Sequence, residues 1–221
     1  MKTMTALAVL ALGAMAAPAQ AAAEHPWQVK LLGTAVLPDG KIDRVDTDIV
    51  GLPATLQTEA NDNYVPTLAV EYFFTENVSV ETICCMSQHD VDATTGLPGA
   101  ELVSDAKVIP ATVTLKYHVP AGAVKPYVGV GPTWFLWVDT NPGAATLPLG
   151  VTRTTLSSEL GVAIQAGVDV ALGDSGFGLS LDAKRYFVNT TARWYAGQTL
   201  AIQTHHNLDP WVLSAGIAKR F

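Results

Sequence analysis

The sequence predicts an all-β protein, an eight-stranded antiparallel up-and-down transmembrane β-barrel. Three observations predict it: a two-residue hydrophobic period, a regular alternation of long and short connections, and aromatic residues gathered near the strand ends. Of the 221 residues, 49% are hydrophobic and only 15% are charged, whereas a disordered chain shows the opposite balance. Beyond residue 21, no apolar run reaches the roughly 18 residues that a membrane helix needs. This composition leaves two classes, a very apolar soluble fold and a membrane β-barrel.

The two-residue period is clearest in the segment 159–172, which reads ELGVAIQAGVDVAL. Alternate residues from Leu160 to Leu172 are apolar and those between them are small or polar, a pattern that helical spacing fits badly. The same rule marks strands in eight segments of the chain. They are 27–37, 64–74, 78–88, 108–118, 126–138, 158–172, 177–188 and 210–221. Each is at least about as long as the 9–11 residues that a tilted strand needs to cross a bilayer.

The connections between these strands alternate strictly in length. Three are short, at 75–77, 119–125 and 173–176. Four are long and rich in Gly, Pro, Asp, Asn and Thr, at 38–63, 89–107, 139–157 and 189–209. An up-and-down barrel with both chain ends on one side has this inventory, with its short turns facing the periplasm. A soluble sandwich has no reason to sort its loops in this way.

The N-terminus predicts the compartment. Lys2 precedes an apolar stretch, 6–17, and Ala19-Gln20-Ala21 resembles a small-x-small cleavage site. We therefore expect a signal peptide at 1–21 and a mature barrel at 22–221, although Ala21-Ala22-Ala23 would move the cut by two residues. About 12 apolar residues are too few for a spanning anchor. Export followed by barrel formation predicts the outer membrane of a bacterium.

The aromatic residues decide which face of the barrel is outside. A lipocalin-like soluble barrel would bury its apolar face, and a membrane barrel would turn that face to lipid. Rings on the apolar face gather near the short turns and termini, at Trp27, Tyr72, Phe74, Tyr117, Phe177 and Phe221, and at the opposite strand ends, at Tyr64, Trp134 and Trp211. Two such belts are typical of the two membrane interfaces. The membrane barrel is therefore favoured.

The opposite face of each strand is predicted to line a narrow lumen. Its charged residues are Lys30, Glu71, Glu81, Lys116, Glu159, Asp169, Asp182, Lys184 and Arg220. We expect them to form a paired network, because an unpaired charge in a tight barrel costs several kcal/mol. Eight strands leave a filled interior rather than an aqueous pore, which disfavours diffusion of ions or sugars.

Four aromatic residues fall on the same inner face. Phe73 and Tyr127 lie at the periplasmic end and are interpreted as packing. Phe135 and Trp137 lie toward the cell surface, where they would either fill space beside inward glycines or line an apolar mouth for a hydrophobic molecule.

The sequence offers little for other chemistry. The net charge of −7 argues against a nucleic-acid partner. Cys84 and Cys85 are neighbours whose side chains point to opposite faces of a strand, so we interpret them as two lone thiols. No zinc, GxSxG or HExxH motif is present, and His89, His205 and His206 are interpreted as solvated loop histidines. We expect no catalytic residue, metal or cofactor.

The chain also resembles a known family across nearly all of its mature length. The matching stretches, in order, are 27–30, 68–81, 110–118, 125–131, 160–169, 208–211 and 220–221. Their order and spacing resemble the outer-membrane protein W (OmpW) family. The resemblance implies passive passage of small hydrophobic molecules through an eight-stranded barrel that is closed toward the periplasm, so that cargo leaves sideways into the membrane. It also implies that Phe221 is read by the barrel assembly machinery. The chain departs from the family pattern at Cys84-Cys85, at Lys184-Arg185 and in a Pro-, Gly- and Ala-rich third long loop.

Three functions stay open at this point. The first is the facilitator of hydrophobic molecules. The second is a surface-binding or envelope-structural protein whose long loops contact other proteins or lipopolysaccharide, with the barrel as an anchor in outer-membrane lipid. The third is an enzyme carried by the loops. The first is preferred, and it depends largely on the family resemblance.

Overall fold

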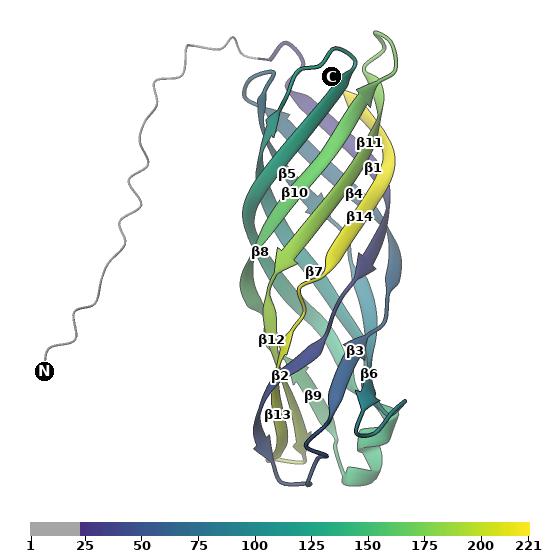
Figure 1. Cartoon of the computed structure of the whole chain (residues 1–221), viewed down its shortest axis with the longest axis vertical. Helices are drawn as coiled ribbons and strands as arrows, with labels where there is room; N and C mark the ends of the chain where they lie inside the picture. The colour runs from purple at the N-terminus through teal and green to yellow at the C-terminus, as the bar shows by residue number, and fades with distance from the viewer. Residues whose placement is uncertain (1–22) are drawn as a thin grey trace, which may run out of the picture.

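The computed structural model describes residues 23–221, so the predicted signal peptide lies outside the described residues. The chain forms one long barrel of tilted strands, with the C-terminus and the short turns at the upper end in Figure 1. The wall consists of β1 (Trp27–Leu37), β4 (Asn63–Phe73), β5 (Val78–Cys84) continued by β6 (Ser87–Thr95), β7 (Glu101–His118), β8 (Val124–Pro142), β10 (Glu159–Ala171), β11 (Phe177–Phe187) and β14 (Trp211–Arg220). Within residues 23–221, no helix is long and apolar enough to cross a membrane.

The barrel is closed, because every wall strand pairs antiparallel with its neighbours around the ring. The first and last strands meet, with Trp27 and Phe221 exchanging main-chain hydrogen bonds of 3.1 and 2.9 Å. Closure removes the sheet edges that would otherwise carry unpaired polar groups into lipid. The predicted fold class, an eight-stranded antiparallel barrel, is confirmed.

The predicted orientation of the two faces is also confirmed. Leu31, Val113 and Ile164 are about half exposed on the outer surface. In contrast, Lys30 and Lys116 are only 1% exposed, because they point into the lumen. Burying charges while exposing leucine, isoleucine and valine is favourable only where hydrocarbon replaces water around the protein.

The four long connections are more regular than their composition suggests. They form a second four-stranded sheet from β2 (Lys41–Asp48), β13 (Thr199–Asn207), β12 (Asn189–Ala196) and β9 (Arg153–Leu156), and they add β3 (Gln57–Ala60), β6 and the 3₁₀ helix η1 (Ala144–Leu149). Together with the long strands β7 and β8, these elements continue the barrel wall beyond the membrane, at the lower end of Figure 1. We call this part the extracellular extension. Its outer strands are polar on both faces, as in KIDRVDTD of β2, so no apolar period predicts them.

One predicted strand, 78–88, is interrupted at Cys85-Met86. Each of the two neighbouring strands carries a proline at this height. Pro110 of β7 lies between Val108 and Thr112, which pair with Ser87 and Ile83. Pro66 of β4 lies just beyond Leu68, the last residue of β4 that pairs with β5. Proline lacks the N–H that a ladder needs. The two prolines therefore account for a break that the alternation of side chains does not reveal.

Candidate functional site

The periplasmic half of the lumen is filled by a network of buried charges. Lys30 Nζ lies 3.0 Å from Glu71, 3.1 Å from Glu81 and 3.2 Å from Asp169. Lys116 Nζ lies 2.9 Å from both glutamates. These side chains come from five different strands, so the contacts tie opposite sides of the barrel together.

The network extends across the lumen through Lys184 and neutral groups. Lys184 Nζ lies 2.6 Å from Asp182 and 3.1 Å from Glu81. Gln165 Nε2 donates to the same two carboxylates, and the Tyr127 hydroxyl donates to Asp182 at 2.8 Å. We call this set of residues the charge plug. Because its side chains fill the barrel from wall to wall, an apolar molecule would have to displace paired ions to pass through it.

The predicted aromatic lining near the periplasm lies at the periplasmic face of the plug. Phe73 and Tyr127 are 2% and 3% exposed, and their rings lie 4.9 and 5.1 Å from the His118 ring. His118 Nε2 in turn contacts Glu71 at 2.9 Å. Lys116 Nζ stands 3.7 Å from the centre of the Tyr127 ring, a cation–π arrangement that supports the cation inside the barrel.

Two of the nine predicted lumen charges lie outside the plug. Glu159 sits at the outer end of β10, where its carboxylate accepts a hydrogen bond from Ser157 at 2.8 Å. Arg220 lies at the periplasmic rim, where it bonds Glu76 at 2.8 Å and stacks 4.0 Å from the Phe73 ring. Both residues lie on the inward-facing side of their strands. However, the ends of these strands extend beyond the filled section of the lumen, so Glu159 and Arg220 do not reach the plug.

The aromatic residues predicted for the membrane interfaces lie on the outer surface. Trp27 and Tyr72 pack edge to face at 4.9 Å, and Tyr72 and Phe74 at 5.2 Å. Those about half exposed are Trp27, Tyr64, Phe74, Tyr117, Trp134, Phe177, Trp211 and Phe221, with Tyr64 the most exposed. Their position at the two ends of the apolar band places the membrane between them.

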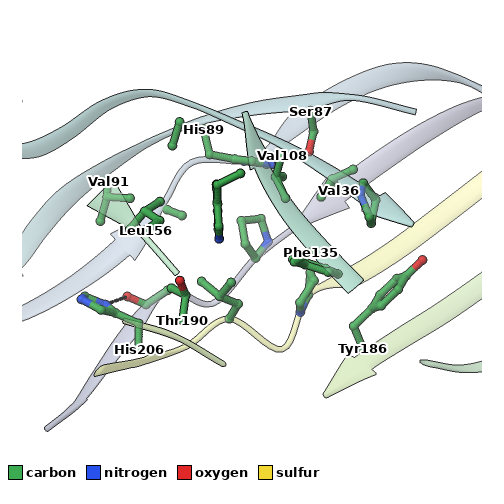
Figure 2. A pocket seen from close by; sticks show the side chains of 18 of the residues that line it. Val36, Ser87, His89, Val91, Val108, Phe135, Leu156, Tyr186, Thr190 and His206 are labelled. Atoms are coloured by element: carbon green, nitrogen blue, oxygen red, sulfur yellow. Dashed lines mark hydrogen bonds between the residues drawn. The ribbon is translucent and has the colours of Figure 1, made fainter. Parts of the chain in front are cut away.

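On the extracellular side of the plug, the lumen contains a small cavity of about 50 Å³ with apolar walls (Figure 2). Phe135 and Tyr186 form one end, with their rings 5.5 Å apart. Trp137, Val108 and Leu208 also line it. Room for roughly four water molecules is too little for an organic molecule, so occupancy requires the wall or the extension to move. Phe135 and Trp137 are thus not at the mouth, as the sequence suggested, but deeper in the barrel, between the charge plug and the extracellular extension.

Two of the histidines interpreted as solvated are buried at this cavity. His89 donates from Nδ1 to the Asn61 carbonyl at 2.7 Å, and its Nε2 lies 2.9 Å from the Ser87 hydroxyl. His206 donates from Nδ1 to the Gly40 carbonyl at 3.1 Å, and its Nε2 lies 2.6 Å from Thr204. Both are 5% exposed. The prediction of solvated loop histidines is wrong for these two, because the extension folds into sheets that turn them inward.

Burial also lowers the pKa of both imidazoles below the ordinary value of 6.5. The hydrogen bonds to Asn61 and Gly40 oppose this shift only in part. His89 and His206 are therefore neutral at pH 7, and within residues 23–221 the cavity has no cationic side chain among its lining residues.

Acidification is expected to loosen the extracellular extension. Because both pKa values are lower in the folded state, the unfolded or locally open state binds protons more tightly. The contribution of the two neutral histidines to the stability of the folded extension is fully present above about pH 6.5 and decreases as the pH falls below that value. Hydrogen exchange of β6 and β13 amides at pH 7 and pH 5, corrected for intrinsic rates, should show faster exchange at pH 5. The membrane strand β14, which contains no histidine, is the control. Equal protection of β6 and β13 at both values would contradict this expectation.

The barrel wall is interrupted beside the cavity. The β4–β5 ladder ends at Leu68 and Cys84, and regular pairing resumes only at Ala60 and Val91 of β3 and β6. Between these points, hydrogen bonds from two asparagine residues join the two sides of the wall. Asn61 donates its main-chain N–H to the Asp90 carbonyl, and the Asn63 side chain donates to the Gln88 carbonyl. We call this stretch the wall gap. Its inner side, at Cys85 and Ser87, lines the cavity.

Sequence reasoning missed several residues of the site. Tyr186 is fully buried against Phe135, and Gln165 bridges two carboxylates in the plug. Both stand on the inward period of their strands, so the alternation could have identified them. Their partners could not be identified, because Glu81 and Phe135 lie 84 and 51 positions away along the chain, on strands that do not pair with those of Gln165 and Tyr186.

The closed barrel, the lipid-facing apolar band and the charge-filled lumen define an outer-membrane β-barrel protein. A model of the OmpW family matches residues 25–221, and the chain belongs to this family. It is 28% identical over 217 residues to outer membrane protein W of Vibrio cholerae, covering 96% of this chain and 95% of the relative. It is 30% identical over 206 residues to an uncharacterised outer-membrane protein of Sinorhizobium fredii, y4mB, covering 91% and 82%. The protein is accordingly one of the bacterial outer membrane.

Solved structures show the same fold. The crystal structure of OprG from Pseudomonas aeruginosa superposes with a TM-score of 0.77 at 21% identity, covering 89% of this chain and 96% of OprG. The structure of AlkL in lipid bilayers gives 0.70 at 22% identity, covering 93% and 95%. At these identities the likeness concerns the fold alone.

Proposed function

We propose that this protein lets small hydrophobic molecules pass from the cell surface into the outer membrane. The observation that carries the proposal is the position of the apolar cavity, which lies on the extracellular side of the charge plug and beside the wall gap. A molecule in the cavity has paired ions on its periplasmic side and an interrupted wall beside it. For an apolar solute, the path through the wall has the lower free energy. Passage through the plug would separate paired ions, which costs free energy, whereas passage through the wall keeps the solute in apolar surroundings.

The approach from outside runs through the extracellular extension, whose interior is also apolar. Ile42, Leu56 and Trp194 line a second, smaller cavity of about 20 Å³, and His206 and Val91 line both cavities. The two cavities therefore adjoin along the barrel axis. Motion of the extension is needed to join them into a passage.

The exit proposed at the wall gap faces hydrocarbon. Leu68, Cys84 and Met86 are about half exposed or more exposed on the outer surface at this height. Opening would break the asparagine hydrogen bonds and the side-chain packing around Cys85, but no continuous main-chain ladder, since that ladder is already absent there. Contacts with lipopolysaccharide and with the assembly machinery stay predictions.

A crosslink across the wall gap tests the proposed exit. Thr67 and Cys85 are the first residues beyond the last ladder pair, Leu68 and Cys84, and both side chains are buried. Thr67→Cys should thus form a disulfide with the native Cys85, since opposed strand residues meet the distance that a disulfide requires. We expect uptake of a hydrophobic probe to fall to that of cells lacking the protein, and reduction to restore it.

Thr67→Ser is the matched control, because it keeps a small polar side chain without a thiol, and it should transport like the parent protein. Uptake that is the same with and without the protein would refute the proposed function. Uptake that requires the protein but continues through the oxidised Thr67→Cys variant would refute only the lateral exit.

A further inference from the structure

The polar atoms around the cavity are almost all paired with one another. Ser87 and His89 are hydrogen-bonded to each other, and His206 bonds Gly40 and Thr204. Thr190 donates to the Ser157 carbonyl at 2.9 Å, and the Tyr186 and Thr112 hydroxyl oxygens lie 3.4 Å apart. These groups are therefore satisfied without any guest in the cavity.

Trp137 differs from these polar side chains of the cavity lining. Its indole Nε1 is buried and has no hydrogen-bond partner among residues 23–221. Trp194, the other inward tryptophan of this region, donates its Nε1–H to the Leu102 carbonyl at 2.9 Å. Buried tryptophan N–H groups usually find such a partner, and an unpaired one costs free energy.

The surroundings of Trp137 offer it no substitute partner. The ring packs against two apolar clusters, one around Phe135 and Tyr186 in the lumen and one around Trp194 and Ile202 in the extension. A water molecule needs two to four polar partners to be held, and the neighbouring polar groups are already engaged with each other. The cavity is thus lined mainly by apolar side chains and by a tryptophan whose indole N–H has no partner within residues 23–221.

We propose that Trp137 Nε1–H is a recognition donor, and that the preferred cargo is a neutral apolar molecule with a single hydrogen-bond acceptor, such as a ketone, ester or ether. This inference rests on the proposed function and names its substrate class. A pure hydrocarbon leaves the indole N–H unpaired. A carboxylate brings a charge into a cavity without a cationic side chain. An acceptor oxygen satisfies the donor while the rest of the molecule contacts the apolar wall.

A pair of isosteric probes tests the preference. The ketone 2-octanone and the alkene 2-methyl-1-octene differ chiefly in replacing the carbonyl oxygen by a methylene group. Protein-dependent uptake is measured for each probe, and the ketone-to-alkene ratio is compared between variants, so that the different water solubilities cancel. Trp137→Phe keeps an aromatic ring and loses only the donor. We expect this substitution to lower the ratio about fivefold while alkene uptake changes little, because one hydrogen bond is lost.

Trp134→Phe is the matched control, because Trp134 lies on the same strand and faces lipid, about half exposed. It should leave the ratio unchanged. A direct measurement avoids transport altogether: in the purified, ¹⁵N-tryptophan-labelled full-length barrel in lipid nanodiscs, 2-octanone should shift the Trp137 indole N–H resonance downfield. The alkene should not, and the Trp137→Phe spectrum identifies the resonance.

The outcomes separate the two claims. If neither probe enters faster with the protein than without it, the proposed function fails, and the resonance still decides whether Trp137 binds the acceptor. If both probes enter and Trp137→Phe leaves the ratio unchanged, or if 2-octanone leaves the resonance in place, the recognition donor is refuted while transport stands.

Discussion

Lys116→Met is expected to destabilise the barrel by about 3–5 kcal/mol. The ammonium group of Lys116 lies 2.9 Å from Glu71 and 2.9 Å from Glu81, and all three side chains are almost fully buried. Methionine fills a similar volume but leaves the two carboxylates with fewer cations. Breaking a buried ion pair costs about 3–5 kcal/mol, a large part of a typical total stability of roughly 5–15 kcal/mol. Urea unfolding in lipid vesicles, or the temperature at which the band shifts on gels, measures the loss.

Lys107→Met is the control for Lys116→Met. Lys107 also forms an ion pair, with Asp139 at 3.0 Å, but both side chains are about a third to a half exposed in the extracellular extension. Screening by water reduces such a pair to about 0–1 kcal/mol. If the two substitutions destabilise the barrel equally, the plug is not what holds the membrane section together.

Gly216→Ala is expected to destabilise the barrel by about 3 kcal/mol. Gly216 of β14 faces the lumen where β1 crosses closest, and a Cβ there would collide with the Leu31 carbonyl oxygen and lie 2.8 Å from the Leu32 Cα. These are main-chain atoms of a paired strand, so they cannot turn away as a side chain would. The two strands would have to separate, which breaks the ladder that joins the first strand to the last. The urea midpoint in lipid vesicles measures the effect.

Gly33→Ala provides the comparison on the same strand pair. Gly33 lies on the lipid side of β1, and a Cβ there would meet only the Ala215 oxygen at 3.9 Å, an ordinary contact. We expect a change of less than about 1 kcal/mol, since glycine itself is a poor strand residue. A Gly216→Ala midpoint equal to that of Gly33→Ala would show that β14 can move away without cost.

The membrane section of the fold was largely predictable from the sequence. The predicted strand 27–37 has the observed bounds of β1, and 177–188 differs from β11 by one residue. The inward placement of Lys30 and the outward placement of Trp27 follow from the same alternation. A transmembrane strand has one face in lipid and one in the lumen, so the polarity of each residue indicates which of the two faces it belongs to.

The site was less predictable, since it depends on contacts between distant strands. The alternation of side chains assigned Arg220 and Glu159 to the lumen, but only the length of each strand beyond the filled section excludes them from the plug. His89 and His206 were misinterpreted for the same reason, because the polar strands of the extension carry no period that would predict their burial.

The sequence by itself determined which residues form the membrane wall and which side of it meets lipid, because a period of two is a local property of each strand. Only the tertiary structure decided the pairing of Lys116 with two glutamates, the wall gap beside Cys85 and the unpartnered indole of Trp137. These features arise from the stagger between neighbouring strands and from the way the barrel closes, which bring together groups far apart in the chain.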